Sequence, residues 1–305
     1  MGSKNTMPFL ISLFAISAAI LLPGGCAGNC SRQDSDRDFT IDLPEDQSED
    51  MERVKQIFYS LPSPLETALI LKSSGAVFNE DLLNPVENVS RYMTNKSMAV
   101  NLGVYTTDLS YASLFDQPQI SIDYMNAAKR LADNLGIIDA VDSETLERLE
   151  ANINDREVIM DIVSETFMNS SSFLQESNRE PVAAMMLTGG WIEGLYLALH
   201  QVDEDDIEQS RMVRIILDKK LSLEIVMLLL RQNSHNDDVA SLMDEVRRIE
   251  DIYSKIEITR SPIEVDRDRD DGVTVLRSTT DARLDREVFR ELKSTVTEIR
   301  TSFVS

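Results

Sequence analysis

Cys26 has the clearest chemical role in this sequence because of what precedes it. A lone basic residue, Lys4, is followed by an apolar run of about 16 residues, 7–22, and then by Gly24 and Gly25. A helix that spans the bilayer core needs about 20 apolar residues. The shorter run and the small residues after it favour a secretory signal that is cleaved before Cys26. The thiol of the new N-terminal cysteine could then carry a lipid.

The order of these features resembles the bacterial lipoprotein signal, in which that cysteine is lipidated and tethers the chain to a membrane. The sequence departs from the pattern at Pro23, where a leucine is usual, because Leu22 lies one place too early. An ordinary signal peptide or an uncleaved anchor is the alternative. N-myristoylation of Gly2 is another, although it gives the apolar run no role. We therefore predict a signal peptide at residues 1–25 and lipidation of Cys26.

Asp108 is the polar side chain that most needs a partner in the predicted fold. It lies within residues 95–115, which are apolar on more than one helical face and therefore predict a buried central helix. A carboxylate buried there without a partner would be costly. Tyr105 and Tyr111 lie three residues away on either side, so we expect tyrosine hydroxyls or backbone amides to donate to Asp108. A polar pocket for a small ligand is the alternative.

Three glycines surround Trp191, the only tryptophan, in the most apolar predicted helix, residues 181–200. Glycine inside a helix costs about 1 kcal/mol relative to alanine, so Gly189, Gly190 and Gly194 require a reason. Close approach of a neighbouring helix is the first explanation. A backbone that lines a ligand cavity beside Trp191 is the second.

An Asp-rich segment that runs from Asp266 to Gly272 has the alternating carboxylates of a calcium loop. Its spacing does not match the EF-hand pattern, because glycine falls at the seventh position rather than the sixth. The twelfth position is Arg277 instead of a bidentate glutamate, and two arginines inside the loop oppose a cation. We expect a solvated turn, and the sequence leaves open whether this loop binds a cation.

The two histidines, His200 and His235, lie far apart in the sequence and have no cysteine near them. Zinc sites normally require more nitrogen or sulfur ligands than this. The sequence also contains no Gly-x-Ser-x-Gly motif and no glycine-rich phosphate loop. We therefore predict no metal, no cofactor and no enzymatic activity.

Charge and cysteine content exclude further classes of protein. The formal net charge is −23, and an acidic surface of this size repels nucleic acid and anionic lipid headgroups. The only two cysteines, Cys26 and Cys30, both lie beside the predicted cleavage site, so no disulfide framework is expected in the body of the protein. We predict no nucleic-acid partner.

The rest of the chain consists of helical patterns with short connections. These patterns predict an all-α, multi-helix bundle of about nine helices. Residues 263–278 alternate apolar and polar side chains around a tight turn, so a short hairpin or loop is expected before the last helix. Residues 26–48 carry the predicted lipidated cysteine and an acidic, flexible tether. Residues 49–305 are predicted to form a single domain.

Particular helix ends are also predicted. Ser63 is a candidate N-cap before Pro64, and Gly75 is a candidate end of the same helix. Two separate helical segments that follow each other closely are expected at about residues 206–218 and 221–232.

Three segments carry a resemblance to known proteins. They are residues 61–66 (LPSPLE), 82–85 (LLNP) and 101–112 (NLGVYTTDLSYA). Together they are similar to a family of uncharacterised helical lipoproteins from Bacteroidota, and the similarity extends from the predicted anchor through about Lys255. The resemblance implies a helical protein tethered in the cell envelope. It implies no established activity and transfers no functional residue.

The sequence therefore favours a membrane-tethered envelope lipoprotein that acts as a non-enzymatic binding or scaffold module. Its expected location is the bacterial cell envelope, anchored through lipid on Cys26 to the outer membrane, on the periplasmic face or the cell surface. An envelope protein is the expected partner. The alternative is a small-ligand sensor or carrier with a pocket formed by Asp108, Tyr105, Tyr111 and Trp191. An unrecognised hydrolase is the third interpretation.

Overall fold

The computed structural model describes residues 61, 63–137, 148, 151–152, 155–205, 207, 210–256, 258–260, 264–266, 275–277, 280–282 and 284–305. The chain divides into two units, residues 1–45 and 46–305, and all described residues belong to the second. The predicted signal peptide, Cys26, the tether and the domain boundary at residue 49 lie outside the described residues.

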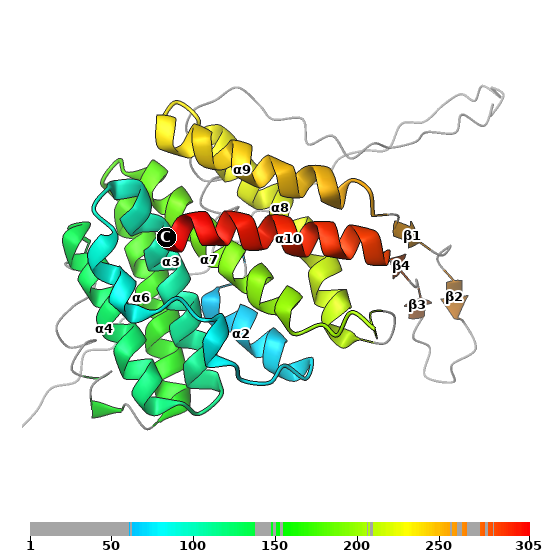
Figure 1. Ribbon diagram of the computed structural model, residues 1–305, viewed down its shortest axis with the longest axis horizontal. Helices are drawn as coiled ribbons and strands as arrows, with labels where there is room; N and C mark the ends of the chain where they lie inside the picture. Colours follow the sequence, from blue (N-terminus) through cyan, green and yellow to red (C-terminus); the bar gives the residue numbers. More distant parts are fainter. Residues whose placement is uncertain are drawn as a thin grey trace, which may run out of the picture. The chain divides into compact units, whose positions relative to one another are not determined.

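Within the described ranges the protein contains eight α-helices and two short 3-10 helices (Figure 1). The α-helices are α2 (Pro64–Ser73), α3 (Asn95–Leu114), α4 (Pro118–Asn134), α6 (Arg156–Glu176), α7 (Glu180–His200), α8 (Arg211–Gln232), α9 (Asp237–Tyr253) and α10 (Arg286–Val304). The 3-10 helices are η1 (Glu80–Leu82) and η2 (Val86–Arg91). The helices pack against one another as a bundle, so the all-α prediction is confirmed.

Helices α3 and α7 make the most extensive contact and form the core of the bundle. Nearly every residue of both helices is buried. Helices α4, α2 and α6 pack on α3, whereas α8 and α10 pack on α7. Helix α7 is long and apolar enough to cross a membrane, but its burial among other helices accounts for that composition.

The glycines of α3 and α7 allow the two backbones to touch. A Cβ added at Gly103 would lie 1.9 Å from the carbonyl oxygen of Met186, and one added at Gly189 would lie 2.1 Å from that of Val100. Only glycine fits at such distances. The predicted close approach of a neighbouring helix is therefore confirmed for Gly189.

Helix α2 begins as its sequence predicts. The backbone N–H of Glu66 donates to Ser63 Oγ at 3.2 Å, and the N–H of Ser63 donates to Glu66 Oε2 at 2.8 Å. This reciprocal capping box satisfies two N–H groups that have no partner within the helix. Pro64 occupies the first helical position, and Gly75 follows the helix with a φ of +94°.

The predicted break near residue 220 is wrong, because α8 continues from Arg211 to Gln232. Lys219 lies on the buried face of this helix, in line with the buried Ile216 and Leu223. A lysine in the apolar stripe interrupts the hydrophobic pattern without interrupting the backbone. The start of the first predicted segment, residue 206, lies outside the described residues.

Four three-residue strands lie between α9 and α10. Strand β1 (Ile258–Arg260) pairs antiparallel with β4 (Thr280–Ala282), and β2 (Glu264–Asp266) pairs antiparallel with β3 (Val275–Arg277). The register places Glu264 opposite Arg277. The hairpin alternative therefore describes this region, and its turn, with the candidate calcium residues after Asp266, lies outside the described residues.

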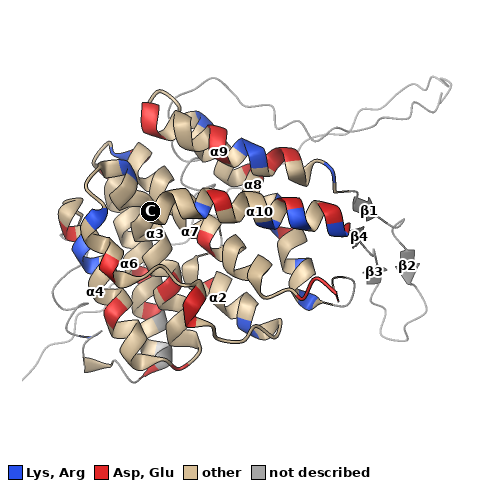
Figure 2. Cartoon of the chain, viewed as in Figure 1, with Lys and Arg blue, Asp and Glu red and all other residues tan. Residues whose placement is uncertain are grey.

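Charged residues are spaced along α9 and α10, which run side by side (Figures 1 and 2). Arg248 pairs with Glu298 at 2.6 Å, and Lys255 pairs with Glu291 at 2.6 Å. These pairs lie on the solvent side, while both helices turn an apolar stripe toward the core.

Candidate functional site: a buried polar cluster

Five polar side chains from separate parts of the chain meet inside the bundle. Helix α3 supplies Asn101 and Asp108, α7 supplies Glu193, α10 supplies Arg300, and the loop between η1 and η2 supplies Asn84. Four of the five residues are 0 % exposed, and Arg300 is 8 % exposed. We call this set the polar cluster. Charged groups are rarely buried to this extent unless they are paired.

Arg300 and Glu193 form a bidentate ion pair within the polar cluster. Arg300 Nε lies 3.0 Å from Glu193 Oε2, and Arg300 Nη2 lies 3.1 Å from Glu193 Oε1. Arg300 Nη2 also donates to the carbonyl of Leu82 at 3.0 Å, and the guanidinium lies 4.6 Å from the ring centroid of Tyr196. The planar guanidinium is suited to such a fork and to the aromatic contact.

Asp108 has one oxygen with a protein donor. Its Oδ2 accepts from the backbone N–H of Asn84 at 3.1 Å, whereas Oδ1 has no donor among the described residues. The Glu193 carboxyl is within hydrogen-bonding reach of Asp108. Burial, and then the negative charge of Glu193, raise the pKa of Asp108 well above its ordinary value, while Arg300 opposes the rise.

The amide side chains connect the polar cluster to the end of α10. Asn84 Nδ2 donates to Asn101 Oδ1 at 3.1 Å and to the hydroxyl of Tyr92 at 3.0 Å. Asn101 Nδ2 donates to the carbonyl of Phe303 at 2.7 Å, and the Tyr92 hydroxyl donates to that of Val304 at 3.3 Å. The last carbonyls of a helix have no partner within it, so these bonds cap α10.

The two tyrosines predicted to donate to Asp108 have other acceptors. Tyr105 donates to the carbonyl of Pro85 at 3.0 Å, and Tyr111 donates to that of Val77 at 2.7 Å. Burial raises the pKa of both hydroxyls. The expectation of tyrosine donors is therefore wrong, and the alternative of a backbone amide donor is confirmed. Both tyrosines fasten the segment before η2 to α3.

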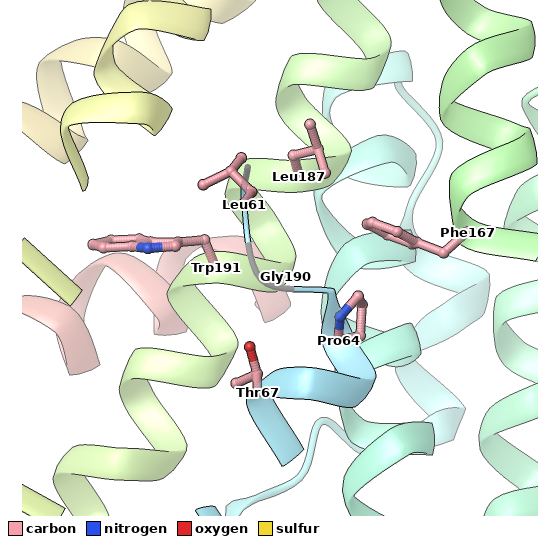
Figure 3. Close-up of a pocket in the computed structure, with 7 residues that line it drawn as sticks. All are labelled: Leu61, Pro64, Thr67, Phe167, Leu187, Gly190 and Trp191. Atoms are coloured by element: carbon pink, nitrogen blue, oxygen red, sulfur yellow. The ribbon is translucent and has the colours of Figure 1, made fainter. Parts of the chain in front are cut away.

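Trp191 lies on another side of α7. Its Nε1 donates to Ser222 Oγ at 2.8 Å. Figure 3 shows it beside a small pocket whose lining residues are Leu61, Pro64, Thr67, Phe167, Leu187, Gly190 and Trp191. The free volume of about 10 Å³ is room for about one water molecule. Trp191 and Glu193 are two residues apart on α7, so they do not face the same side, and Asp108 does not line this pocket.

Lys219 is a buried cation beside Trp191. It is 6 % exposed, its Nζ lies 6.0 Å from the ring centroid of Trp191, and among the described residues no carboxylate offsets its burial. A Cβ added at Gly194 would lie 3.5 Å from this Nζ. Burial lowers the pKa of Lys219 to about 8, because desolvation disfavours the charged amine.

The sequence indicated Asp108 but not its partners. Glu193 lies in a helix that is apolar all round, and Arg300 lies on the same stripe as Val296 and Phe303. A charged residue in the buried face of a predicted helix requires a partner of opposite charge. Applied to every helix, that rule would have identified Glu193, Arg300 and Lys219 as buried charges, without indicating which of them pair.

The polar cluster is a closed arrangement in which charges and amides contact one another rather than an open cavity. Over the described ranges, no group of three or more His, Cys, Asp or Glu side chains is placed to hold a metal ion. No protein-family model, curated protein or solved structure was found to match this chain.

Proposed function

We propose that this protein is a lipid-tethered module of the bacterial cell envelope that acts by binding or scaffolding another envelope protein. The tether is the lipid on Cys26, and the helical body is the part that a partner contacts. The expected resemblance to helical lipoproteins of Bacteroidota agrees with this proposal.

The observation that supports a scaffold most directly is that buried polar groups bond helices to one another. Arg300 bonds to Glu193 and to a backbone carbonyl, and Asn101 bonds to the last turn of α10. These groups join helices that are distant in sequence. Apart from Asp108 Oδ1, which lacks a protein donor, the groups of this network are bonded to one another, and such networks make a core rigid and specify one arrangement. A rigid body is suited to presenting a fixed surface.

The alternative, a small-ligand carrier, has less support. Ligand pockets typically enclose about 300–1,000 Å³. The pocket beside Trp191 has a free volume of about 10 Å³, and Asp108 faces the polar cluster instead.

Lipidation is tested by substituting Cys26→Ser in the native host. We expect the variant to lose incorporation of labelled palmitate and to move from the membrane fraction to the soluble fraction. Cys30→Ser is the matched control and should leave both results unchanged, because Cys30 lies after the predicted cleavage site. Unchanged labelling of the Cys26→Ser protein would refute the tether.

The binding role is tested by native mass spectrometry of the protein purified gently from its host. A stoichiometric envelope protein that copurifies, and that binds again after both partners are purified separately, is expected. A copurifying small molecule that is lost on Asp108→Ala would instead favour the ligand carrier.

A further inference from the structure

We propose that Asp108 and Glu193 share one proton, and that loss of this proton releases the C-terminal end of helix α10 from the core. This inference goes beyond the proposed function and does not depend on it.

The charge balance of the polar cluster supports the first part of the proposal, the proton shared by Asp108 and Glu193. Two carboxyl groups that are 0 % exposed face one guanidinium, which makes both of its carboxylate bonds to Glu193. If both acids were ionised, one negative charge would remain buried without a counter-ion, which is costly. A proton between Asp108 and Glu193 removes that charge. It also gives a partner to Asp108 Oδ1, which lacks a protein donor.

The other titratable groups around Asp108 and Glu193 keep the same charge as the pH rises, so only the proton on the two acids can change the charge of the polar cluster. The titratable groups whose charges interact with Asp108 are Tyr105, Tyr111, Tyr124 and Tyr196, in addition to Glu193 and Arg300. Burial raises the pKa of all four tyrosines, so they stay neutral at moderately alkaline pH. Arg300 stays charged. Of Asp108, the four tyrosines and Arg300, Asp108 is therefore the first to lose a proton as the pH rises.

The second part of the proposal, the release of α10, follows from the bonds that link the polar cluster to this helix. Arg300 is on α10, and its only described carboxylate partner is Glu193. Asn84, whose N–H donates to Asp108, also donates to Asn101, which bonds to Phe303 near the end of α10. A second negative charge at Asp108 would repel Glu193 and compete with it for Arg300, whose guanidinium links α7 to α10. The end of α10 would then be held mainly by the bonds of Asn101, Tyr92 and Asn88 to its last carbonyls, so its attachment to the core would weaken, whereas α9 contributes no group to the polar cluster.

The test compares the intact protein with its Asp108→Asn variant, both purified in mild detergent. An asparagine is neutral at every pH, accepts from the Asn84 N–H and donates to Glu193, so it imitates the protonated acid. Asp123→Asn removes an exposed carboxylate of α4 and serves as the charge-matched control. Urea unfolding is measured from pH 6 to pH 9.5.

Asp108 has a raised pKa in the folded state, so its contribution to stability is present at low pH and is lost as the pH rises. We expect the unfolding equilibrium constant of the unsubstituted protein to rise at least about tenfold more over this range than that of Asp108→Asn, which corresponds to about one pKa unit. The Asp123→Asn protein should follow the unsubstituted one. Identical pH dependence in all three would overturn the proposal.

Release of α10 is measured by hydrogen exchange, corrected for the intrinsic pH dependence of the amides. Amides in the last two turns of α10 should lose protection at high pH in the unsubstituted protein and keep it in Asp108→Asn. Equal loss of protection in α3, α7 and α10 would show global unfolding and would overturn the release step.

If Asp108→Asn does not fold, the infrared spectrum of the unsubstituted protein still decides the first step. A protonated carboxyl absorbs at a frequency distinct from ionised carboxylates. We expect such a band at pH 7, where exposed acids are ionised, and its loss at high pH. Absence of the band at pH 7 would overturn the shared proton.

Discussion

At the scale of single residues, burial decides what an ion pair is worth. Arg300 and Arg248 both bind a glutamate through a guanidinium fork. The Arg300 pair is buried, whereas about half or more of each side chain of the Arg248–Glu298 pair is exposed. Solvent screens the exposed pair, so its attraction is weak. Removing one partner of a buried pair leaves the other charge without compensation.

Replacing Arg300 by methionine should therefore destabilise the protein by about 3–5 kcal/mol, because Glu193 would remain buried without a cation. Arg248→Met is the matched control and should produce little measurable change. Urea unfolding at pH 7 measures both. Equal effects of the two substitutions would contradict the burial argument. A double Arg300→Met, Glu193→Gln variant should recover part of the loss.

Lys219, unlike Arg300, is a buried charge without a carboxylate partner among the described residues, so its removal should stabilise the folded protein. Its pKa falls from 10.5 to about 8 in the folded state, which corresponds to a penalty of about 3 kcal/mol for the charged amine. The folded protein binds this proton less tightly than the unfolded chain. Its stability should therefore rise with pH between about 8 and 10.5, and the full penalty should apply below that range.

We expect Lys219→Met to stabilise the protein by about 2–3 kcal/mol at pH 7, because methionine keeps the apolar stem and removes the charge. The gain should shrink as the pH approaches 10.5. Lys220→Met, at the neighbouring and more exposed position, is the control. Urea unfolding at pH 7 and pH 10 measures both variants. A loss of stability in Lys219→Met would contradict this prediction and would mean that the amine makes a stabilising polar interaction in the folded protein.

At the scale of elements, the contact between α3 and α7 fixes the positions of Asp108 and Glu193 relative to each other. Alanine normally stabilises a helix relative to glycine by about 1 kcal/mol. At Gly103 a Cβ would lie 1.9 Å from a backbone oxygen, so the two helices would have to separate. At Gly190 the nearest atoms would be Thr107 Oγ1 at 3.2 Å and a backbone oxygen at 3.3 Å, which a small shift can relieve.

Gly103→Ala should therefore destabilise the protein by about 3 kcal/mol or more, since overpacking against backbone exceeds the gain in helix propensity. Gly190→Ala should cost less than about 1.5 kcal/mol. Thermal and urea unfolding measure the ranking. The reverse order, or two equal effects, would mean that α3 and α7 can separate freely.

The elements also show how much the sequence could predict and where it failed. Local signals were sufficient for the start of α2, because the capping box and proline act within four residues. They failed at α8, because Lys219 places a charge in an apolar stripe that only tertiary packing tolerates. They located Asp108 but missed Glu193 and Arg300, because pairing across 107 residues depends on how helices pack.

At the scale of the whole molecule, excess negative charge opposes folding. The chain has 53 acidic and 30 basic residues, so at least 23 carboxylates have no basic counterpart at neutral pH. Compaction brings these charges closer together and destabilises the folded state through self-repulsion. Exposed ion pairs such as Lys255–Glu291 act in the other direction, but each contributes little.

We therefore expect salt to stabilise this protein at pH 7. Raising NaCl from about 0.01 M to about 1 M shortens the screening length from about 30 Å to about 3 Å and weakens the repulsion between acids that are not paired. The exposed pairs weaken as well, but the excess of acids means that the repulsive contacts outnumber them. The thermal unfolding midpoint should rise steadily across this series.

The control for this prediction is the same series at pH 4.4, near the isoelectric point. Little net charge remains there, so the rise should disappear or reverse as salt screens the remaining attractions. A midpoint that falls with salt at pH 7 would mean that the ion pairs along α9 and α10 outweigh the net charge. Attraction within the network of surface ion pairs would then exceed the repulsion between unpaired acids, and the surface charges would stabilise the folded state.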